Sequence, residues 1–501
     1  MADKEEQHHQ HHIVMLPFMA QGHLIPFLAL ANQIHRRFGF TITIATTPLN
    51  VRHLAAAVAK NPTPSSGIHL FELPLNTSDH GLPPNAENTE SLPLNLVVNL
   101  FHSSTSLEPP FRALIQNITA DQNGRPPLCI ISDVFMGWAN AVAESFGTVN
   151  VTFSTGGAYG TAAYVSLWQH LPHRRRTADD EFNLPGFPDS CVFHITQLHS
   201  FLRAADGTDS WSRFFQPQIE NSMNSFGWLC NTAEEIEPLG LNILKNYTNL
   251  PVWCIGPLLP PRMLNSNPTE RLIGQHTGRK PGVSAEKCLE WLDSRSERSV
   301  LYISFGSQNT ITPSQMMALA MGLEESKKPF IWVIRPPFGF DLKGEFKSEE
   351  WLPIGFEQRV ADVALVVHGW APQLEILCHK STGAFLTHCG WNSTAESLSQ
   401  GVPMIGWPLA AEQGYNAKML VEEMGVCVEL TRGLAGVVSR EKVKSVIESV
   451  MDGGDKAEEM KKKAGEIGEL MKLALSDGVG SSHRAMDKFV SALLSHKQET
   501  A

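Results

Sequence analysis

The sequence predicts an α/β protein of two domains, each a doubly wound parallel β-sheet covered by helices. Three observations lead to this prediction. The chain has 501 residues, which is too long for one ordinary domain and fits two domains of about 200–250 residues each. Short β-branched apolar runs alternate with helical segments along both halves of the chain. The runs are apolar at successive positions, as strands buried on both faces of a parallel sheet are.

The first half of the chain carries five of the predicted strands. The opening strand spans 12–18, and after a short loop a helix follows over 24–38. Helical segments also separate the later strands, which is the order of βαβ units in a parallel sheet. These later strands are expected at 41–47, 68–74, 128–134 and 148–154.

The second half repeats this alternation after a change of composition near residue 255. Residues 257–283 are rich in Pro, Asn, Gly and Arg, which is typical of an exposed linker. Six strands are then expected, at 299–306, 330–335, 364–370, 383–389, 402–407 and 426–430. Helices are expected at 313–326, 373–379, 392–400, 413–424, 438–451, 454–474 and 482–495.

These elements divide the chain into an N-terminal domain, a linker, a C-terminal domain and a final helix, over 1–256, 257–283, 284–480 and 481–501. The final helix has apolar residues at helical spacing, so we expect it to pack back on the N-terminal domain. These residues are Met486, Phe489, Val490 and Leu493. Ligands of open α/β sheets bind outside the carboxyl ends of the strands, and we expect a cleft between the domains to hold the site.

The composition disfavours several classes of protein. The net charge of −11 argues against nucleic acid or anionic lipid as a partner. Apolar residues make up 42% of the chain, which is enough to bury a core and excludes general disorder. The 8 cysteines are scattered without a C-x-x-C pair. Their spacing disfavours a zinc site or a disulfide framework and suits a reducing cytosol.

The N-terminus lacks the basic start of a secretory signal. The most apolar window, residues 13–31, is interrupted by Pro17, Gln21, His23 and Pro26. A membrane helix of about 20 apolar residues would not carry such a cluster. We therefore expect a cytoplasmic protein without an integral membrane segment, and we expect it to be a monomer.

Two polar residues of the first half follow strands at the edge where ligands are expected. His23 comes after the first strand, behind Gly22, which would allow a tight turn, and it could act as a general base near neutral pH. Asp133 ends the strand at 128–134, where it could cap a helix over 137–146. Alternatively it could accept a hydrogen bond from the far ring nitrogen of His23, fix its tautomer and stabilise its protonated form. Taken alone, His23 could equally be a capping or packing residue.

Polar segments also follow strands of the second half. Ser307 follows the strand at 299–306, where small residues and a hydroxyl could meet a phosphate. Residues 387–393, Thr-His-Cys-Gly-Trp-Asn-Ser, open a helix, whose amides and positive dipole end attract anions. The dinucleotide fingerprint G-x-G-x-x-G, the P-loop G-K-[ST] and the acidic pair D-x-D are absent.

Residues 370–413 resemble the 44-residue donor-binding signature of the plant family 1 UDP-dependent glycosyltransferases. The matching positions are W-A-P-Q at 370–373, H-C-G-W-N-S at 388–393, Glu396, G-V-P at 401–403, W-P at 407–408 and E-Q at 412–413. Gly22-His23, Asp133 and I-G-P at 255–257 also match, so the resemblance covers essentially the whole chain. It implies a GT-B fold, in which two Rossmann-like domains face each other across a cleft. It also implies metal-independent transfer with inversion, no cofactor, and a UDP-sugar donor as the partner.

The resemblance assigns roles to the residues at matching positions. His23 would be the catalytic base and Asp133 its partner. UDP would be bound by Ser307, Trp370, Ala371, Gln373, His388, Asn392, Ser393 and Glu396. Among these, Trp370 would stack on uracil, Gln373 and Glu396 would hold the ribose hydroxyls, and the remaining polar residues would hold the diphosphate. The sugar would be bound by Thr155, Trp391, Glu412 and Gln413.

The end of the signature bears on the donor sugar. Gln413 stands at the position where glutamine usually accompanies UDP-glucose and histidine accompanies galactose. Two departures occur beside it. Glu412 replaces the commoner aspartate, and Gly414-Tyr415 stands where an aromatic residue usually comes first. Because glutamate keeps the carboxylate, we still expect UDP-glucose as the donor.

The acceptor would be bound by loops of the N-terminal domain. Aromatic and Met side chains there would suit a flat or bulky apolar acceptor, although ordinary core packing explains each of them equally well. The candidates are Phe18, Met19, Phe101, Phe135, Met136, Trp168, Phe187 and Phe201.

These observations predict an inverting, UDP-glucose-dependent O-glucosyltransferase of plant secondary metabolism. Its acceptor would be a small lipophilic molecule, with flavonoids and other phenolics expected first and terpenoids or steroids second. The alternatives are another UDP-sugar, C-linkage, a sugar-nucleotide epimerase or dehydrogenase, and a non-catalytic nucleotide-sugar binder. The missing G-x-G-x-x-G disfavours the dehydrogenase, and the His23–Asp133 pair disfavours the binder.

Overall fold

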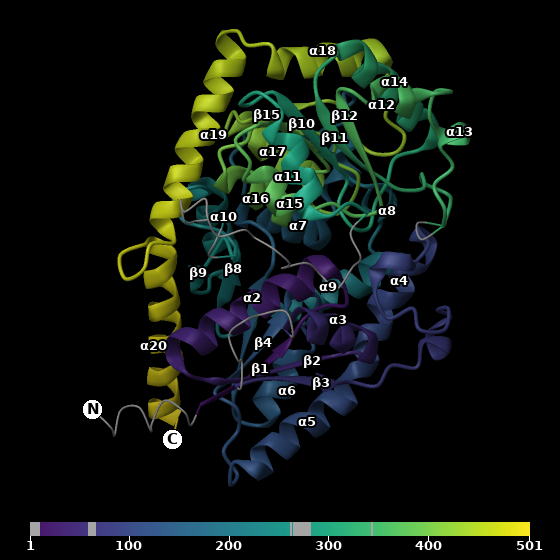
Figure 1. Cartoon of the computed structure of the whole chain (residues 1–501). Coiled ribbons are helices and arrows are strands. Elements are labelled where there is room, and N and C mark those ends of the chain that lie inside the picture. Colours follow the sequence, from purple (N-terminus) through teal and green to yellow (C-terminus); the bar gives the residue numbers. More distant parts are fainter. Residues whose placement is uncertain (1–10, 59–66, 261–262, 264–281, 342–343, 501) are drawn as a thin grey trace. The chain divides into compact units, whose positions relative to one another are not determined.

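The chain folds into two compact units. The computed structural model describes residues 11–58, 67–260, 263, 282–341 and 344–500 (Figure 1). The first unit comprises Met1–Phe193, Phe201–Leu258 and Ala474–Ala501. The second unit comprises His194–Ser200 and Leu259–Leu473. Most of the predicted linker at 257–283 lies outside the described residues.

The first unit is built on a seven-stranded sheet of order β3-β2-β1-β4-β5-β8-β9, whose described pairs are all parallel. The order runs outward in both directions from β1 and β4, which is the doubly wound topology that the sequence predicts. The strands are β1 His12–Leu16, β2 Thr41–Thr46, β3 Ile68–Glu72, β4 Cys129–Asp133, β5 Val149–Ser154, β8 Trp228–Cys230 and β9 Val252–Cys254. The last two strands were not predicted, because runs of three residues show no periodicity.

Helices and one small sheet complete the first unit. The helices are α2 Gln21–Phe38, α3 Pro48–Val58, α4 Leu94–Ser103, α5 Glu108–Asp121, α6 Ala139–Ser145, α7 Ala158–His170, α8 Ser200–Ala204, α9 Ser210–Ser222, α10 Pro238–Thr248 and α20 Ser481–Thr500. The small sheet pairs β6 Glu181–Asn183 with β7 Val192–His194. Gly22 lies inside α2 and does not make the predicted tight turn, because residues 17–20 already connect β1 to the helix.

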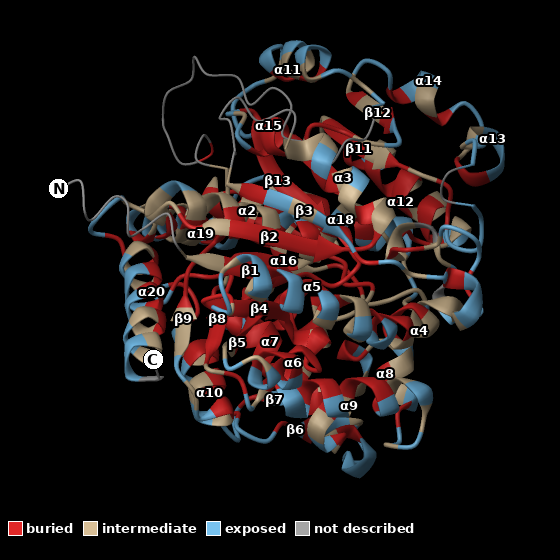
Figure 2. Cartoon of the chain, turned by 90° about the horizontal axis from the view of Figure 1, so that it is seen from below, coloured by how far each residue is buried: buried red, intermediate tan, exposed pale blue. Residues whose placement is uncertain are grey.

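The C-terminal helix α20 forms part of the core of the first unit. Its side chains Met486, Phe489, Val490 and Leu493 are buried in the same cluster as Ile13 of β1. In Figure 2, α20 is buried along one side and exposed along the other. The Phe489 ring lies 5.3 Å from that of Trp253 on β9. The C-terminal helix α20, which is far from β1 in sequence, therefore completes the core of the first unit.

The second unit is built on a six-stranded sheet of order β12-β11-β10-β13-β14-β15, again with all described pairs parallel. Its order also runs outward from two central strands, β10 and β13, so the loops after these strands meet at one edge. The strands are β10 Val300–Ser304, β11 Phe330–Ile334, β12 Ala364–His368, β13 Thr382–Thr387, β14 Met404–Gly406 and β15 Cys427–Glu429.

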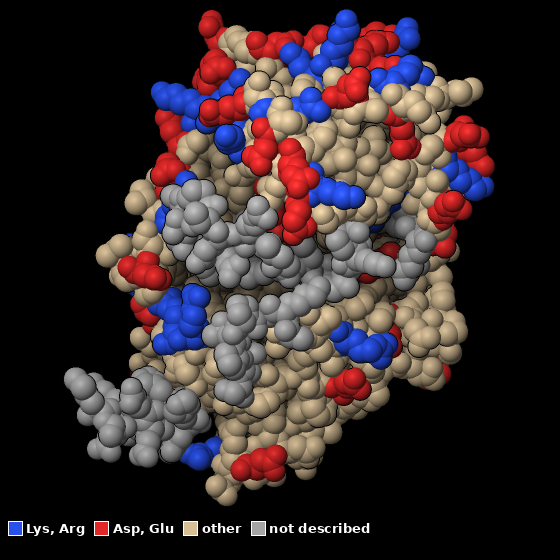
Figure 3. All heavy atoms as spheres, viewed as in Figure 1, with Lys and Arg blue, Asp and Glu red and all other residues tan. Residues whose placement is uncertain are grey.

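The helices of the second unit alternate with these strands. They are α11 Ala285–Asp293, α12 Pro313–Ser326, α13 Ser348–Trp351, α14 Phe356–Val360, α15 Gln373–Leu377, α16 Trp391–Ser399, α17 Gln413–Glu422, α18 Arg440–Met451 and α19 Asp455–Ala474. On the face seen in Figure 3, Lys and Arg side chains are interspersed with Asp and Glu. Within the described ranges, no helix is both long and apolar enough to cross a bilayer.

We predict that Phe489→Ala lowers the free energy of unfolding of the first unit by about 3–5 kcal/mol, because it removes a fully buried ring from the core. Urea denaturation of the full chain measures the change. Lys488→Ala, at an exposed neighbouring position on the same helix, is the control and should change stability by less than about 0.5 kcal/mol. Equal effects of the two substitutions would contradict the packing of α20.

Candidate active site

The topology of the first sheet brings His23 and Asp133 together. His23 lies in the first turn of α2, just after β1, and Asp133 is the last residue of the adjacent strand β4. Nδ1 of His23 and Oδ2 of Asp133 are 2.6 Å apart. The aspartate is fully buried, whereas 22% of the histidine side chain is exposed. A proton on Nδ1 held by the carboxylate makes Nε2 the basic nitrogen of the ring.

The second oxygen of the Asp133 carboxylate has a separate partner. Oδ1 accepts a hydrogen bond from the Phe135 backbone N–H at 3.0 Å. It thereby caps the short 3-10 turn Val134–Met136. The helix that follows, α6, begins only at Ala139, so Asp133 does not cap it as one alternative held. The expected contact with His23 is therefore present, the expected cap of a helix over 137–146 is not, and the bond to the Phe135 N–H fixes the carboxylate that faces His23.

Thr155 also lies close to His23. Its hydroxyl oxygen is 3.4 Å from Nδ1 of His23, at the limit of a hydrogen bond. Two side chains of the segment that follows β8 hold the loop that carries Thr155. Asn231 donates to the Thr155 carbonyl at 3.1 Å, and the buried Glu237 accepts from the N–H groups that begin α7. Burial raises the pKa of the Glu237 carboxyl.

Aromatic rings surround His23. Phe18 and Phe135 lie 5.6 and 5.5 Å from the imidazole, measured between ring centroids. Phe101 stacks on Phe18 at 4.2 Å. Phe201 packs on Trp211 of α9 at 4.9 Å, and Trp211 lies 5.5 Å from Phe101. The predicted base is thus set in an apolar, aromatic surrounding.

The other predicted acceptor residues differ in their surroundings. Met19 and Met136 are fully buried, and so is Trp168, which stacks on Phe215. Phe187 belongs to a different group, with Tyr159 and Phe193. Ring contacts therefore gather Phe18, Phe101, Phe135 and Phe201 into one set, which Trp168 joins through Phe215, whereas Phe187 packs in the other group.

In the second unit, the segment after β13 opens helix α16 at Gly390. Cys389 adopts a left-handed conformation with φ 61°, and Gly390 is the N-cap residue without a capping side chain. Trp391 and Ser393 are buried in the first turn, and Asn392 lies between them. The start of this helix has the features of an anion site, because its first amides point along the axis without a side-chain cap.

The ring of His388 fits between two glycines. A Cβ atom added to Gly306 or Gly390 would lie 2.6 or 2.5 Å from Nε2 of His388. Gly306 also has a positive φ of 73°, which favours glycine. Nδ1 of His388 is buried and has no hydrogen-bond partner among the residues that the structure describes. Burial, and secondarily the charge of Arg335, lower the pKa of His388 to about 4, so the ring is neutral at pH 7.

A hydrogen-bonded group joins three of the predicted UDP-binding residues. Nε2 of Gln373 donates to Glu396 at 2.6 Å and to the Ser393 hydroxyl at 2.9 Å. Oε1 of Gln373 accepts from the Tyr302 hydroxyl at 3.1 Å. Trp370 and Ala371 directly precede this group in the chain, and the Trp370 carbonyl accepts from the Gly282 N–H. Amide, carboxylate and hydroxyl groups are the partners that the vicinal hydroxyls of a ribose require.

Glu412 and Gln413 lie at the start of α17. Oε1 of Gln413 accepts from the backbone N–H groups of Leu409 and Ala410, at 2.9 and 2.8 Å. These bonds close a tight loop in which Ala411 has a positive φ of 50°. The side-chain Oε1 of Gln413 is thus used by the loop itself. The Nε2 amide nitrogen is the group of this side chain that can donate to a ligand.

Gly414 makes the close packing beside this pair possible. The backbone oxygen of Gln197 lies against Gly414, and an added Cβ would fall far inside van der Waals distance of that oxygen. The neighbouring Thr196 hydroxyl accepts a hydrogen bond from Arg432 at 2.9 Å. The departure from an aromatic residue at position 414 therefore has a local cause, because the 195–197 turn occupies the space.

Several residues of these sites were missed by the sequence analysis. Trp211, Phe214 and Phe215 contact Phe101. Their i, i+3, i+4 spacing is that of one face of a helix, so the sequence could have predicted that they share a face. Arg335 ends the predicted strand 330–335 at the ligand edge, which was also a signal. Tyr302 lies inside a strand, and only the tertiary structure shows that its hydroxyl reaches Gln373. No cluster of three or more His, Cys, Asp or Glu with metal-ligand geometry occurs in the described part of the chain.

The chain is similar to known proteins along its whole length. Residues 9–260 match the family model described as glycosyltransferase, N-terminal domain, and residues 261–463 match that described as UDP-glucoronosyl and UDP-glucosyl transferase. It is 42% identical over 498 residues to UDP-glycosyltransferase 92A1 of Arabidopsis thaliana, covering 97% of this chain and 98% of that protein. It is 46% identical over 448 residues to crocetin glucosyltransferase 3 of Crocus sativus, covering 88% and 90%.

A solved structure is similar as well. The crystal structure of UGT73P12 from Glycyrrhiza uralensis, complexed with glycyrrhetinic acid 3-O-monoglucuronide, matches with a TM-score of 0.82 at 28% identity. The match covers 97% of this chain and 96% of that one. With the two doubly wound parallel sheets, this likeness confirms the predicted GT-B fold.

We predict that Gly414→Ala destabilises the second unit by about 1–3 kcal/mol, because the new methyl group overpacks against Gln197. Alanine in place of glycine within a helix normally stabilises by roughly 0.5–1 kcal/mol. The sign of the stability change in Gly414→Ala therefore tests the contact with Gln197. Gly465→Ala in α19 is the matched control, since a Cβ there meets nothing within 4 Å, and it should stabilise. Thermal unfolding measures both, and stabilisation by both substitutions would contradict the contact.

Proposed function

Because the chain belongs to the plant family 1 UDP-dependent glycosyltransferases, we propose that it is an inverting, UDP-glucose-dependent O-glucosyltransferase. Its acceptor is a hydroxyl group of a small lipophilic plant metabolite. The observation that carries this proposal is the 2.6 Å contact between Nδ1 of His23 and the buried carboxylate of Asp133. None of the eight cysteines forms a disulfide in the described residues, and seven of them are buried, which is compatible with a cytoplasmic enzyme.

His23 acts as the general base. Its Nε2 takes the proton of the acceptor hydroxyl as the acceptor oxygen forms a bond to the anomeric carbon. The bond from that carbon to the β-phosphate oxygen breaks, and UDP leaves with the electron pair. Attack from the face opposite to UDP inverts the anomeric configuration. Asp133 stabilises the imidazolium that forms and keeps Nε2 unprotonated beforehand.

The donor signature provides the UDP site. Trp370 stacks on uracil, Gln373 and Glu396 bind the ribose hydroxyls, and Ser393 belongs to the same hydrogen-bonded group. The neutral ring of His388 donates one hydrogen bond to the diphosphate, beside Ser307 and the first turn of α16 with Asn392. These donors and the helix dipole stabilise the charge that develops on UDP, so we propose that no metal ion is needed.

Trp391, Glu412, Gln413 and Thr155 bind the sugar. Glu412 accepts hydrogen bonds from sugar hydroxyls, and Gln413 donates through Nε2, because its Oε1 is used by Leu409 and Ala410. A pair with one acceptor and one donor can distinguish neighbouring hydroxyl groups by their orientation. This arrangement supports glucose as the transferred sugar.

The acceptor binds against the aromatic set around His23. Phe135 and Phe201 give flat apolar surfaces with partial exposure, beside the buried ring of Phe101, which favours ring systems stacked on or against them. We propose a flavonoid or other phenolic first and a terpenoid or steroid second. The relatives named for crocetin and crystallised with a glycyrrhetinic acid glucuronide support including the second class.

An acceptor screen with the purified full chain tests the function. UDP-glucose with flavonoid, simple phenolic, triterpenoid and diterpenoid pools, in EDTA without added metal, is followed by mass spectrometry for an added hexose. We expect a hexose adduct whose glycosidic bond is released by acid, as an O-glucoside is. A product stable to acid would contradict O-linkage, and transfer only from another UDP-sugar would contradict glucose.

We predict that His23→Ala lowers kcat by about 10²–10⁴-fold, the range of general-base catalysis, while the Kd for UDP changes by less than about twofold. Asp133→Asn keeps a side-chain oxygen for the Phe135 N–H but loses the charge, so kcat should fall by at least about tenfold. Steady-state kinetics and calorimetry measure the two effects. Unchanged turnover in His23→Ala would exclude this residue as the base.

A further inference from the structure

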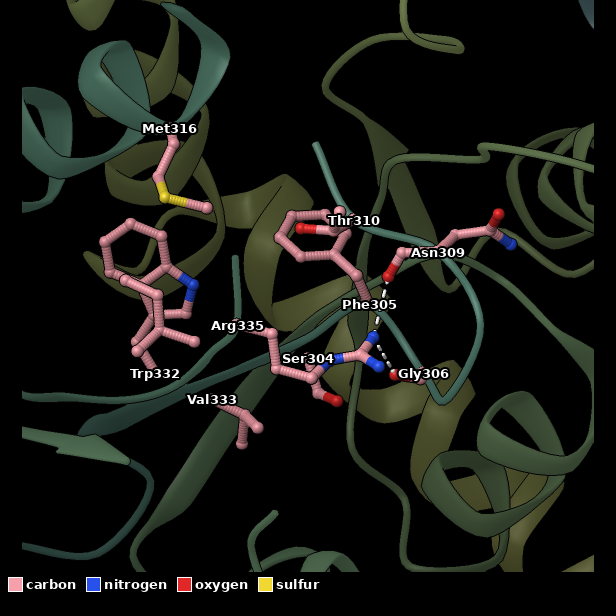
Figure 4. Close-up of a pocket in the computed structure, with 10 residues that line it drawn as sticks. Ser304, Phe305, Gly306, Asn309, Thr310, Met316, Trp332, Val333 and Arg335 are labelled. Carbon is pink, nitrogen blue, oxygen red and sulfur yellow. Dashed lines mark hydrogen bonds between the residues drawn. The ribbon is translucent and has the colours of Figure 1, made fainter. Parts of the chain in front are cut away.

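Arg335 holds the loop that follows the central strand β10. It comes directly after β11, which pairs with β10 in the second sheet. Its guanidinium donates to three backbone carbonyls, those of Gly306 at 2.6 Å, Ser307 at 2.8 Å and Asn309 at 2.7 Å. Figure 4 shows two of these bonds, with Arg335 pointing across a pocket toward Gly306 and Asn309. A planar guanidinium can bind several carbonyls at once, whereas an ammonium group acts as a single point of charge.

These bonds fix the orientation of the peptide units in the loop. In a trans peptide the carbonyl of one residue and the N–H of the next point in opposite directions. With the carbonyls of Gly306 and Ser307 turned to Arg335, the N–H groups of Ser307 and Gln308 are turned away from it. Among the described residues, no acceptor takes the Ser307 N–H. Successive amides that point to one side form a concave site for an anion.

The other groups suited to a diphosphate lie around the same glycine. The His388 ring packs against Gly306, with Nε2 within 2.6 Å of the place where a Cβ would be. Gly390, on the other side of that ring, begins α16. The guanidinium charge acts on His388 strongly enough to contribute to the lowered pKa of that ring. A phosphate near His388 would therefore also feel the positive charge of Arg335.

We propose that Arg335 is a positioning residue for the donor diphosphate. It holds the carbonyls of the 306–309 loop away from the phosphates, so that the backbone amides and the Ser307 hydroxyl face them. The inference deepens the proposed function and rests on it. Without the guanidinium, these carbonyl oxygens lose their donor, and any that turn toward the phosphates repel them. The contribution of Arg335 is specific to the phosphates, because uracil and ribose are assigned to Trp370, Gln373 and Glu396.

Binding of uridine, UMP and UDP to the full chain tests this role. Calorimetry is done on the wild type, Arg335→Met and Arg335→Lys. We expect the Kd for UDP to rise about tenfold or more in Arg335→Met, since hydrogen bonds from the backbone N–H groups of the loop to the charged phosphates are lost. The Kd for uridine should stay within about twofold of the wild type. Arg335→Lys should resemble Arg335→Met, because a lysine cannot bind the three carbonyls together.

Arg359→Met is the matched control. Arg359 lies in the same unit but is an exposed partner of Glu324, so its loss should leave the UDP affinity unchanged. Should Arg335→Met fail to fold, the same comparison in Arg335→Lys decides. Equal weakening of uridine and UDP, or wild-type UDP affinity in Arg335→Lys, would overturn the positioning role. A wild type that does not bind UDP would instead overturn the proposed function.

Discussion

The order of the strands is the constraint on which both candidate sites depend. In each sheet the order runs outward from two central parallel strands, β1 with β4 and β10 with β13. Their carboxyl ends lie side by side, so the residues that follow them must meet. In the first unit this places His23 beside Asp133. In the second it places Gly306 beside His388. The residues of the proposed reaction therefore follow the central strands of two similar sheets.

The two candidate sites, around His23 and around His388, have opposite electrostatic requirements in the proposed reaction. In the proposed reaction the first site accepts a proton, and the buried carboxylate of Asp133, fixed by a backbone N–H, would stabilise the charged imidazole of His23. The second site would bind the donor diphosphate, and it offers a neutral histidine, a helix start and backbone amides. The surroundings of the two histidines differ. His23 faces a buried carboxylate, whereas burial first, and the charge of Arg335 second, lower the pKa of His388.

The sequence was sufficient for the fold class and for the residues that follow the central strands. Apolar runs of five to eight residues predicted all strands of the second sheet and five of the first, and the motif around His388 predicted the start of α16. Strands β8 and β9 were too short to show a pattern. The contact of Gly414 with Gln197 and that of Tyr302 with Gln373 join residues far apart in the chain, so no local pattern reports them. Of the eight acceptor candidates, composition alone could not separate Phe187 from the set around His23.

The central claim is that His23 removes the acceptor proton. It is tested most directly by the turnover of wild type and His23→Ala with a series of phenols of decreasing pKa. A phenol that is already ionised at the assay pH needs no base, so the ratio of wild-type to variant turnover should shrink toward one as the phenol pKa falls. A ratio that stays constant across the series would contradict the role of His23 as the general base.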